Sequence, residues 1–153
     1  MTLADSITVT PICVADLLAE GERMPVYVHV IDHAEARVLV DTGMTERHPA
    51  VADLDPRLRP LSEQAFDLAG IDMVVNTHLH FDHCGGNHLV AGRPVHVQRV
   101  ELEEALGRDD HTIREWVEAP DEPGTEGQLR VRALEPELVW LAHEHEPWRP
   151  RAV

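Results

Sequence analysis

The sequence predicts an α/β fold, because short apolar segments typical of β-strands flank a helical pattern. Residues 26–31 (Val-Tyr-Val-His-Val-Ile) are rich in β-branched side chains, and residues 38–40 and 73–75 are continuous apolar runs, as in strands that are covered on both faces. Between the last two segments, Ser62 can cap a helix that ends at Ala69. Strand, helix and strand in this order are typical of α/β domains.

The first strands are expected to include a hairpin. Residues 7–10 alternate apolar and polar side chains, which predicts a half-buried strand that ends at Pro11. Residues 26–31 and 38–40 follow as two further strands. The polar residues 32–37 between them predict the turn of the hairpin.

Residues 44–60 are predicted to form an irregular surface segment, because three prolines alternate there with acidic residues. His48 lies in this segment and is expected to be solvated, as a lone loop histidine usually is. The strand at residues 73–75 then places the residues after it at the carboxyl end of a strand, where α/β folds usually build their sites.

The composition limits the classes of protein to which the chain can belong. With 153 residues and 43% hydrophobic content, it is long enough for one domain with a real core. Its formal net charge of −15 disfavours nucleic acid, because binding phosphates needs clustered Lys and Arg. No basic leader precedes Pro11 and no apolar run reaches membrane-spanning length, so we expect a cytoplasmic protein without a membrane partner. Cys13 and Cys84 lack CxxC spacing and are predicted to be free thiols.

Four potential metal ligands follow the strand at residues 73–75 within a short stretch: His78, His80, Asp82 and His83. In an extended chain alternate side chains share a face, so His78 and His80 can converge on one ion. Asp82 and His83 then point differently, which suits a second ion beside the first. Such clusters of nitrogen and oxygen ligands rarely serve packing alone, so the stretch predicts a zinc site.

The residues next to this cluster have more ordinary interpretations. Gly85 and Gly86 are expected to allow close backbone approach where the loop folds over the metal. Cys84 could be a ligand, but a packing role is the prediction. His88 is not expected to be a ligand, because the helix that it starts would have to turn it back toward the loop.

Two further elements are predicted after the cluster. Residues 94–97 should form a strand, with His96 facing solvent. Residues 100–108 should be helical. His111 is expected to lie on a surface turn.

The stretch His-Leu-His-Phe-Asp-His-Cys-Gly-Gly-Asn (residues 78–87) resembles the HxHxDH signature of the metallo-β-lactamase superfamily, and is most similar to its N-acyl homoserine lactonase branch. The resemblance implies an αββα sandwich, zinc as the cofactor, and hydrolysis of a lactone or small ester by a metal-bound hydroxide. It implies that Asp82 is a catalytic residue as well as a ligand. It also implies that Asp41, in an Asp-Thr-Gly sequence that closes a strand beneath the metal loop, orients a ligand. An ordinary turn is the alternative for Asp41.

The resemblance breaks off in the middle of the chain. The family carries a third histidine for the first zinc, typically in a Pro-Gly-His-Thr sequence, and a Gly-Asp whose carboxylate bridges both ions, and this sequence has neither. Residues 125–150 resemble the family's C-terminal end, where His143 matches the last zinc ligand and His145 is the alternative. The chain is therefore expected to be a single domain (residues 1–153), an incomplete sandwich in which residues 1–119 correspond to the family's N-terminal part.

Three hypotheses about function follow. The first is a zinc hydrolase with impaired activity and a small-molecule lactone or ester substrate. One or two ions would bind, one of them more tightly, because Asp82, His83 and His143 would hold one ion but only His78 and His80 the other. The second is a catalytically silent zinc-binding remnant of the same fold, and the third is an acidic interaction protein with incidental histidines. Strand edges left open by the missing middle also predict a homodimer.

Overall fold

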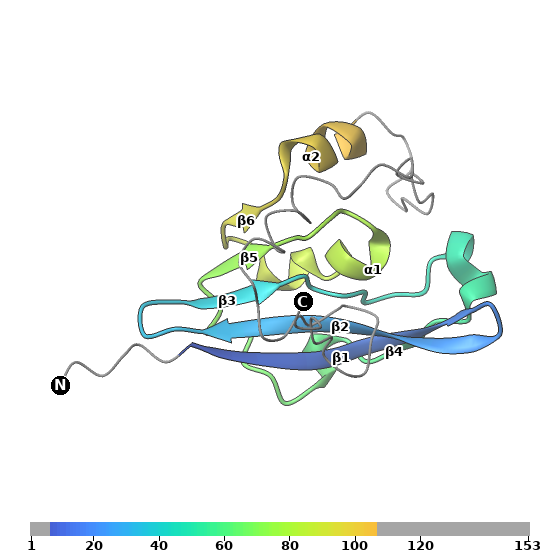
Figure 1. Ribbon diagram of the computed structural model, residues 1–153, viewed down its shortest axis with the longest axis horizontal. Coiled ribbons are helices and arrows are strands. Elements are labelled where there is room, and N and C mark those ends of the chain that lie inside the picture. Colours follow the sequence, from blue (N-terminus) through green and yellow to red (C-terminus); the bar gives the residue numbers. More distant parts are fainter. Residues whose placement is uncertain (1–6, 107–153) are drawn as a thin grey trace, which may run out of the picture.

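The computed structural model describes residues 7–106, which form a six-stranded mixed sheet with short helices beside it (Figure 1). The strands are β1 (Thr8–Ala19), β2 (Glu22–Asp32), β3 (Arg37–Val40), β4 (Arg57–Leu58), β5 (Met73–Val75) and β6 (Val95–His96), and their order in the sheet is β4-β1-β2-β3-β5-β6. The helices are α1 (Phe81–Cys84) and α2 (Arg99–Leu106), with the 3-10 helices η1 (Pro49–Leu54), η2 (Leu61–Glu63) and η3 (Asn87–Val90). The predicted α/β fold is confirmed.

β1 and β2 form a long antiparallel hairpin, and the prediction that the first strand ends at Pro11 is wrong. β1 continues to Ala19, with a bulge between Cys13 and Ala15. Proline lacks the N–H group that a strand pairing uses, so within sheets it is confined largely to edges. Among the residues described, β4 pairs only with Ala15 and Asp16 of β1. Pro11 therefore lies where β1 is an edge, and the strand passes through it.

The predicted hairpin between β2 and β3 is confirmed, and the sheet continues from β3 with parallel strands. His33 and Ala36 exchange main-chain hydrogen bonds of 3.0 and 3.3 Å across the turn. β3 pairs in parallel with β5, and β5 with β6. The N–H of Asp41 extends the pairing by donating to the carbonyl of Val75, at 2.8 Å. The residues that follow β3 and β5 therefore meet at one edge of the sheet.

The prediction of a helix over residues 62–69 is wrong, because Gln64 is bonded to β1 and Asp67 binds main-chain N–H groups of its own turn. The backbone of Gln64 is extended, and its side-chain amide donates to a main-chain carbonyl of β1 at 3.1 Å. The carboxylate of Asp67 accepts hydrogen bonds from the N–H groups of Ala69 and Gly70. The local bonds of Asp67 compete with helical ones. Only the short η2 remains.

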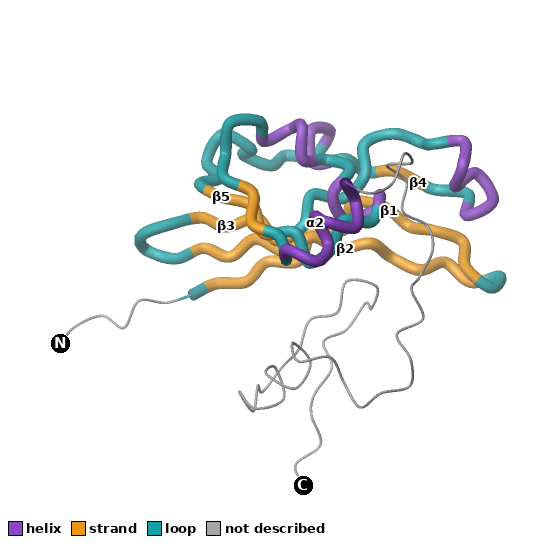
Figure 2. Tube along the Cα trace, turned by 90° about the horizontal axis from the view of Figure 1, so that it is seen from above, coloured by secondary structure: helices purple, strands orange, loops and turns teal. Residues whose placement is uncertain are grey.

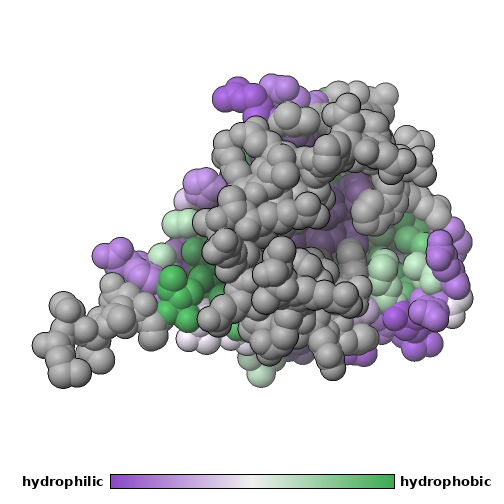
Figure 3. Space-filling model, viewed as in Figure 1, coloured by the Kyte–Doolittle hydropathy of each residue, from purple (hydrophilic) through white to green (hydrophobic). Residues whose placement is uncertain are grey.

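The hydrophobic core is built mainly from the strands, which form one twisted layer (Figure 2). Its buried members are Val14, Ala15, Leu17, Val26, Val28, Val30, Leu39, Met44, Leu61, Ile71, Val74 and Val90. Val51 in η1 is also fully buried, so the segment 44–60 is more ordered than the predicted irregular surface. Figure 3 shows hydrophilic side chains at the top of the molecule, where α2 lies, although α2 also exposes Leu102 and Leu106. No helix within residues 7–106 is long and apolar enough to cross a membrane.

One prediction concerns the outer edge of β1. In the described part of the chain, the segment from Thr8 to Ile12 pairs with β2 on one side and with no strand on the other, and Ile7 and Val9 are 64% and 43% exposed. An open edge with exposed apolar side chains promotes pairing with another chain. We therefore expect a homodimer, which light scattering after size-exclusion chromatography would detect. A monodisperse monomer over a wide concentration range would contradict this expectation.

Candidate metal centre

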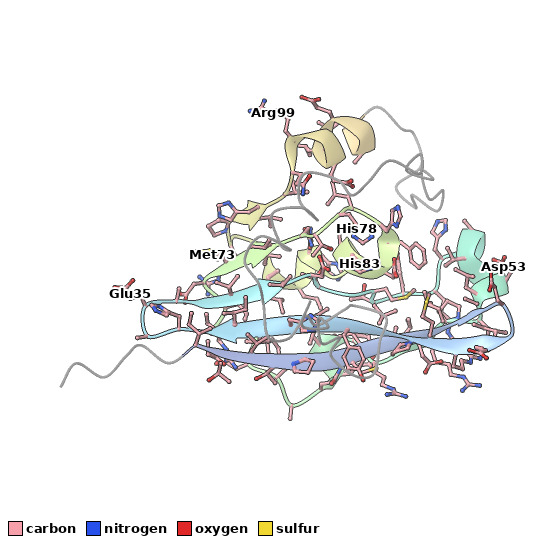
Figure 4. The ribbon with its side chains drawn as sticks, in the orientation of Figure 1. Glu35, Asp53, Met73, His78, His83 and Arg99 are labelled. Atoms are coloured by element: carbon pink, nitrogen blue, oxygen red, sulfur yellow. The ribbon has the colours of Figure 1, made fainter. Side chains whose placement is uncertain are left out.

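The four predicted ligands lie at the carboxyl end of β5, where the chain turns into α1. His80 is the N-cap of α1, with an extended backbone, so Asp82 and His83 fall within the single turn of this helix. The ring centroid of His78 lies 4.5 Å from that of His80 and 4.0 Å from that of His83. Figure 4 shows His78 and His83 beside each other at this end of the sheet. The structure brings the four side chains together, and their role as ligands stays a prediction.

Asp82 and His83 have the spacing of two ligands of one zinc ion. Asp82 Oδ2 lies 3.5 Å from His83 Nε2, and the two residues are only 6% and 2% exposed. Donor atoms bound to a tetrahedral zinc at about 2.0–2.1 Å lie about 3.3 Å apart. The pair therefore fits a shared zinc ion both in geometry and in the chemistry of its donors.

The carboxylate of Asp41 contacts the other nitrogen of the His83 ring. Asp41 Oδ2 lies 2.8 Å from His83 Nδ1, and the same carboxylate accepts hydrogen bonds from the N–H and the hydroxyl of Thr77, at 2.8 and 2.7 Å. With the proton on Nδ1, Nε2 keeps the lone pair that a metal would use. Asp41 has a left-handed backbone, with φ of 60°. A carboxylate in this position is how proteins commonly orient a metal-binding histidine.

The pKa values of Asp41 and His83 shift in the directions expected for such a pair. Burial by itself raises the pKa of Asp41 and lowers that of His83. The hydrogen bond and the attraction between the two groups outweigh burial, so the pKa of Asp41 is lowered and the pKa of His83 is raised. The charge of Asp82 adds to the effect on His83. The ring of His83 thus lies in an environment that favours positive charge, as a metal site does.

His78 and Cys84 are shifted toward their neutral forms. Burial, and then the charges of His83 and His80, lower the pKa of His78 to about 4. His78 is therefore neutral at neutral pH, which is the form that binds a metal. Burial, together with the two nearby aspartates, raises the pKa of Cys84 to about 11. A protonated, partly buried thiol agrees with the packing role predicted for Cys84.

The predicted close backbone approach at the two glycines is confirmed. A Cβ atom on Gly85 would lie 2.6 Å from the carbonyl oxygen of Phe81, and one on Gly86 would lie 2.4 Å from the carbonyl oxygen of Thr42. The N–H of Gly86 donates to the carbonyl of Gly43 at 2.9 Å. The loop after α1 is therefore packed directly on the turn after β3.

We expect Gly86→Ala to lower the free energy of unfolding by about 3 kcal/mol, because overpacking costs roughly 1–3 kcal/mol and the hydrogen bond to Gly43 would weaken as well. Gly70→Ala is the matched control. Its new Cβ atom would meet only the ends of two side chains, Asp67 at 2.8 Å and Arg37 at 3.4 Å, which can move, so the expected loss is below about 1 kcal/mol. Chemical denaturation measures both. Equal losses would show that the contact with the Thr42 backbone does not matter.

Three other histidines named from the sequence lie in the described part of the chain and do not join this cluster, whereas His111 lies outside that part. His48 caps η1, the ring of His88 contacts a main-chain carbonyl, and His96 is exposed on β6. His143 and its alternative His145 lie outside the residues that the structure describes. Residues 7–106 contain no group of three or more His, Cys, Asp or Glu arranged to hold one ion. This is expected if each ion takes only two ligands from this part of the chain.

Two contacts of the segment between β5 and α1 (residues 76–80) could not be predicted from the sequence. Thr77 binds Asp41, as described above, and Glu101 Oε2 accepts a hydrogen bond from the N–H of Leu79 at 3.3 Å. Leu79 lies between His78 and His80, so this bond connects α2 to the loop that carries both. Each contact joins segments that are far apart in the sequence, and no local pattern indicates such a pair.

Comparison with known proteins gives one consistent result. Residues 21–148 match the family described as the metallo-beta-lactamase superfamily. An N-acyl homoserine lactonase of Bacillus thuringiensis is 30% identical over an alignment of 106 residues, which covers 58% of this chain and 42% of that protein. The solved structure of a quorum-quenching N-acyl homoserine lactone lactonase has a TM-score of 0.54 and 27% identity, over 69% of this chain and 52% of that one.

A second solved structure is similar to the same extent. It is an N-acyl homoserine lactone hydrolase with the product N-hexanoyl-L-homoserine bound at its catalytic metal centre, and it matches with a TM-score of 0.51 and 26% identity, over 71% of this chain and 54% of that one. The chain thus spans about half the length of the relatives that it matches, or somewhat less.

Proposed function

Because the chain belongs to the metallo-beta-lactamase superfamily, we propose that it is a zinc-dependent hydrolase of a lactone or a small ester. The observation that carries the proposal is the group of His78, His80, Asp82 and His83 at the carboxyl end of β5, with Asp41 against the ring of His83. The names of the relatives, N-acyl homoserine lactonases, support the substrate class.

The donor set divides into two groups. His78 and His80 would hold one ion, and Asp82, His83 and His143 the other. Bound zinc supplies a water whose pKa is lowered toward ~7 and polarises a substrate carbonyl. Asp41 keeps the proton of His83 on Nδ1 and so leaves Nε2 for the metal. Asp82 presents its carboxylate beside that nitrogen.

We expect one tightly held zinc ion per chain. Three ligands are proposed for the ion at Asp82, His83 and His143, but only two for the ion at His78 and His80, whereas zinc prefers four donors. Metal analysis of protein purified and dialysed without added zinc would give the ratio. Two equally tight ions would contradict the division and require a further ligand.

The proposed activity is weak. The sequence has no counterpart of the family's Pro-Gly-His-Thr histidine or of its bridging carboxylate, so the attacking hydroxide would be positioned poorly between the ions. A misplacement of about 1 Å can cost on the order of a hundredfold in rate. A catalytically silent zinc-binding protein is the second candidate, and the observation that favours it is that the chain spans only 42% of the lactonase that it matches.

The test is metal analysis combined with a hydrolysis screen on the same purified sample. Short-chain and long-chain N-acyl homoserine lactones, simple lactones and aryl esters would be offered to the protein as purified, after chelation, and after zinc is restored. The proposal expects turnover that is lost on chelation and regained with zinc. Bound zinc without turnover at any zinc concentration would favour the silent protein, and absence of bound zinc would favour the acidic interaction protein.

A further inference from the structure

Three polar side chains next to the metal loop form a connected group, here named the tether (Thr42, Asn76 and Asn87). The hydroxyl of Thr42 lies 2.8 Å from Asn87 Oδ1, and Asn87 Nδ2 donates to Asn76 Oδ1 at 2.8 Å. Thr42 and Asn76 are each 2% exposed. The tether joins the turn after β3, the end of β5 and the start of η3.

The tether converges on the main-chain carbonyl of His83. This oxygen accepts the N–H of Thr42 at 2.8 Å, and it lies 3.3 Å from the Thr42 hydroxyl and 3.4 Å from Asn76 Nδ2. The ring of the same residue is held by Asp41, the neighbour of Thr42 in the sequence. His83 is therefore held at two points, its backbone by the tether and its ring by a carboxylate.

A single helical turn cannot fix its own position. α1 has only four residues, and helices this short are unstable without outside contacts. Removing one member of the tether would leave buried polar partners without hydrogen bonds, which is costly. The strain would be relieved most easily by a shift of α1 away from the turn after β3, and such a shift would move the ring of His83 relative to the carboxylate of Asp41.

We propose that Thr42, Asn76 and Asn87 are positioning residues that set the place of His83 for metal binding without touching the metal. The inference rests on the proposed function, since it assumes that His83 is a ligand. On this inference the three polar residues affect metal binding, and not only the stability of the segments that they join.

The test compares two substitutions at the same position. Thr42→Val removes the hydroxyl and keeps the shape, whereas Thr42→Ser keeps the hydroxyl. Zinc affinity, measured by competition with a chromophoric chelator, should fall about 10–100-fold in Thr42→Val, as it does when partners of ligands are lost elsewhere. It should stay within about threefold of wild type in Thr42→Ser. Asn87→Ala should behave like Thr42→Val.

Val30→Ala is the control for a loss of stability alone. Val30 is a core residue of β2 that is 1% exposed, and its truncation should destabilise the chain but leave zinc affinity unchanged. A second readout, in the metal-free protein, is the NMR signal of the His83 ring N–H that faces Asp41. Its exchange with solvent should be faster in Thr42→Val and Asn87→Ala than in Val30→Ala.

The outcomes separate this inference from the proposed function. Weaker zinc binding in Thr42→Val, with no turnover by any form of the protein, supports the tether and contradicts only hydrolysis. Unchanged zinc affinity in Thr42→Val and Asn87→Ala overturns the tether and leaves hydrolysis standing. Equal weakening in Val30→Ala also overturns it, because the effect would then reflect stability alone. Absence of zinc from the wild-type protein overturns both proposals.

Discussion

Asp82→Ala should weaken zinc binding by more than about 100-fold. In other metal sites, the loss of a residue that only hydrogen-bonds to a ligand already lowers metal affinity about 10–100-fold. Hydrolysis of any lactone or ester found as substrate should fall to the uncatalysed rate. Asp82 is 6% exposed and its Oδ2 lies 3.5 Å from His83 Nε2, so its carboxylate is within reach of an ion bound to that nitrogen. Zinc content after dialysis and turnover with the best substrate of the screen measure the two effects.

The matched control is Asp67→Ala, which removes an aspartate from an exposed turn outside the cluster. It should keep both zinc and turnover, although the turn that it caps becomes less stable. Turnover that survives both Asp82→Ala and chelation would show that the metal mechanism is wrong for this chain.

Asp41→Ala should destabilise the metal-free protein by about 3–5 kcal/mol, the usual cost of removing one partner from a buried pair. The substitution would leave His83 Nδ1 and both donors of Thr77 without their acceptor. It would also place alanine in a left-handed conformation that disfavours it. Denaturant unfolding in the presence of a chelator measures the loss.

Asp41→Asn separates the effect of the lost charge from the effect of the left-handed backbone. Asparagine tolerates the left-handed backbone and keeps one acceptor oxygen, but it has no charge to hold the proton of His83 on Nδ1. We expect a stability between those of wild type and Asp41→Ala, with zinc affinity still reduced about 10-fold or more. If Asp41→Asn binds zinc as tightly as wild type, Asp41 is an ordinary turn residue.

Local patterns were sufficient for β2, β3 and β5 and for the grouping of the four predicted ligands. The apolar runs of β2, β3 and β5, and the polar turn between β2 and β3, are where the sequence places them. The histidines gather because the loop that carries them is continuous, so their spacing along the chain already limits their spacing in three dimensions.

Contacts between segments that are far apart in the sequence could not be predicted from local patterns. The apolar stripe of residues 62–69 is typical of a helix, but Gln64 is bonded to β1 and Asp67 to its own turn. A proline such as Pro11 predicts the end of a strand. Only the folded chain shows that, in the part that the structure describes, β1 has a free edge at this point, where a proline is tolerated. The tether is assembled from three separate turns, and only the folded chain brings them together.

The left-handed backbone of Asp41 restricts which residue can stand at this position. Glycine, asparagine and aspartate are the residues that adopt this conformation most readily. Of these three, aspartate alone carries a negative charge. Glutamate, which would be the conservative exchange in most other places, has the charge but not the backbone preference. Conformation and electrostatics therefore each reduce the choice independently, and aspartate is the one residue that satisfies both.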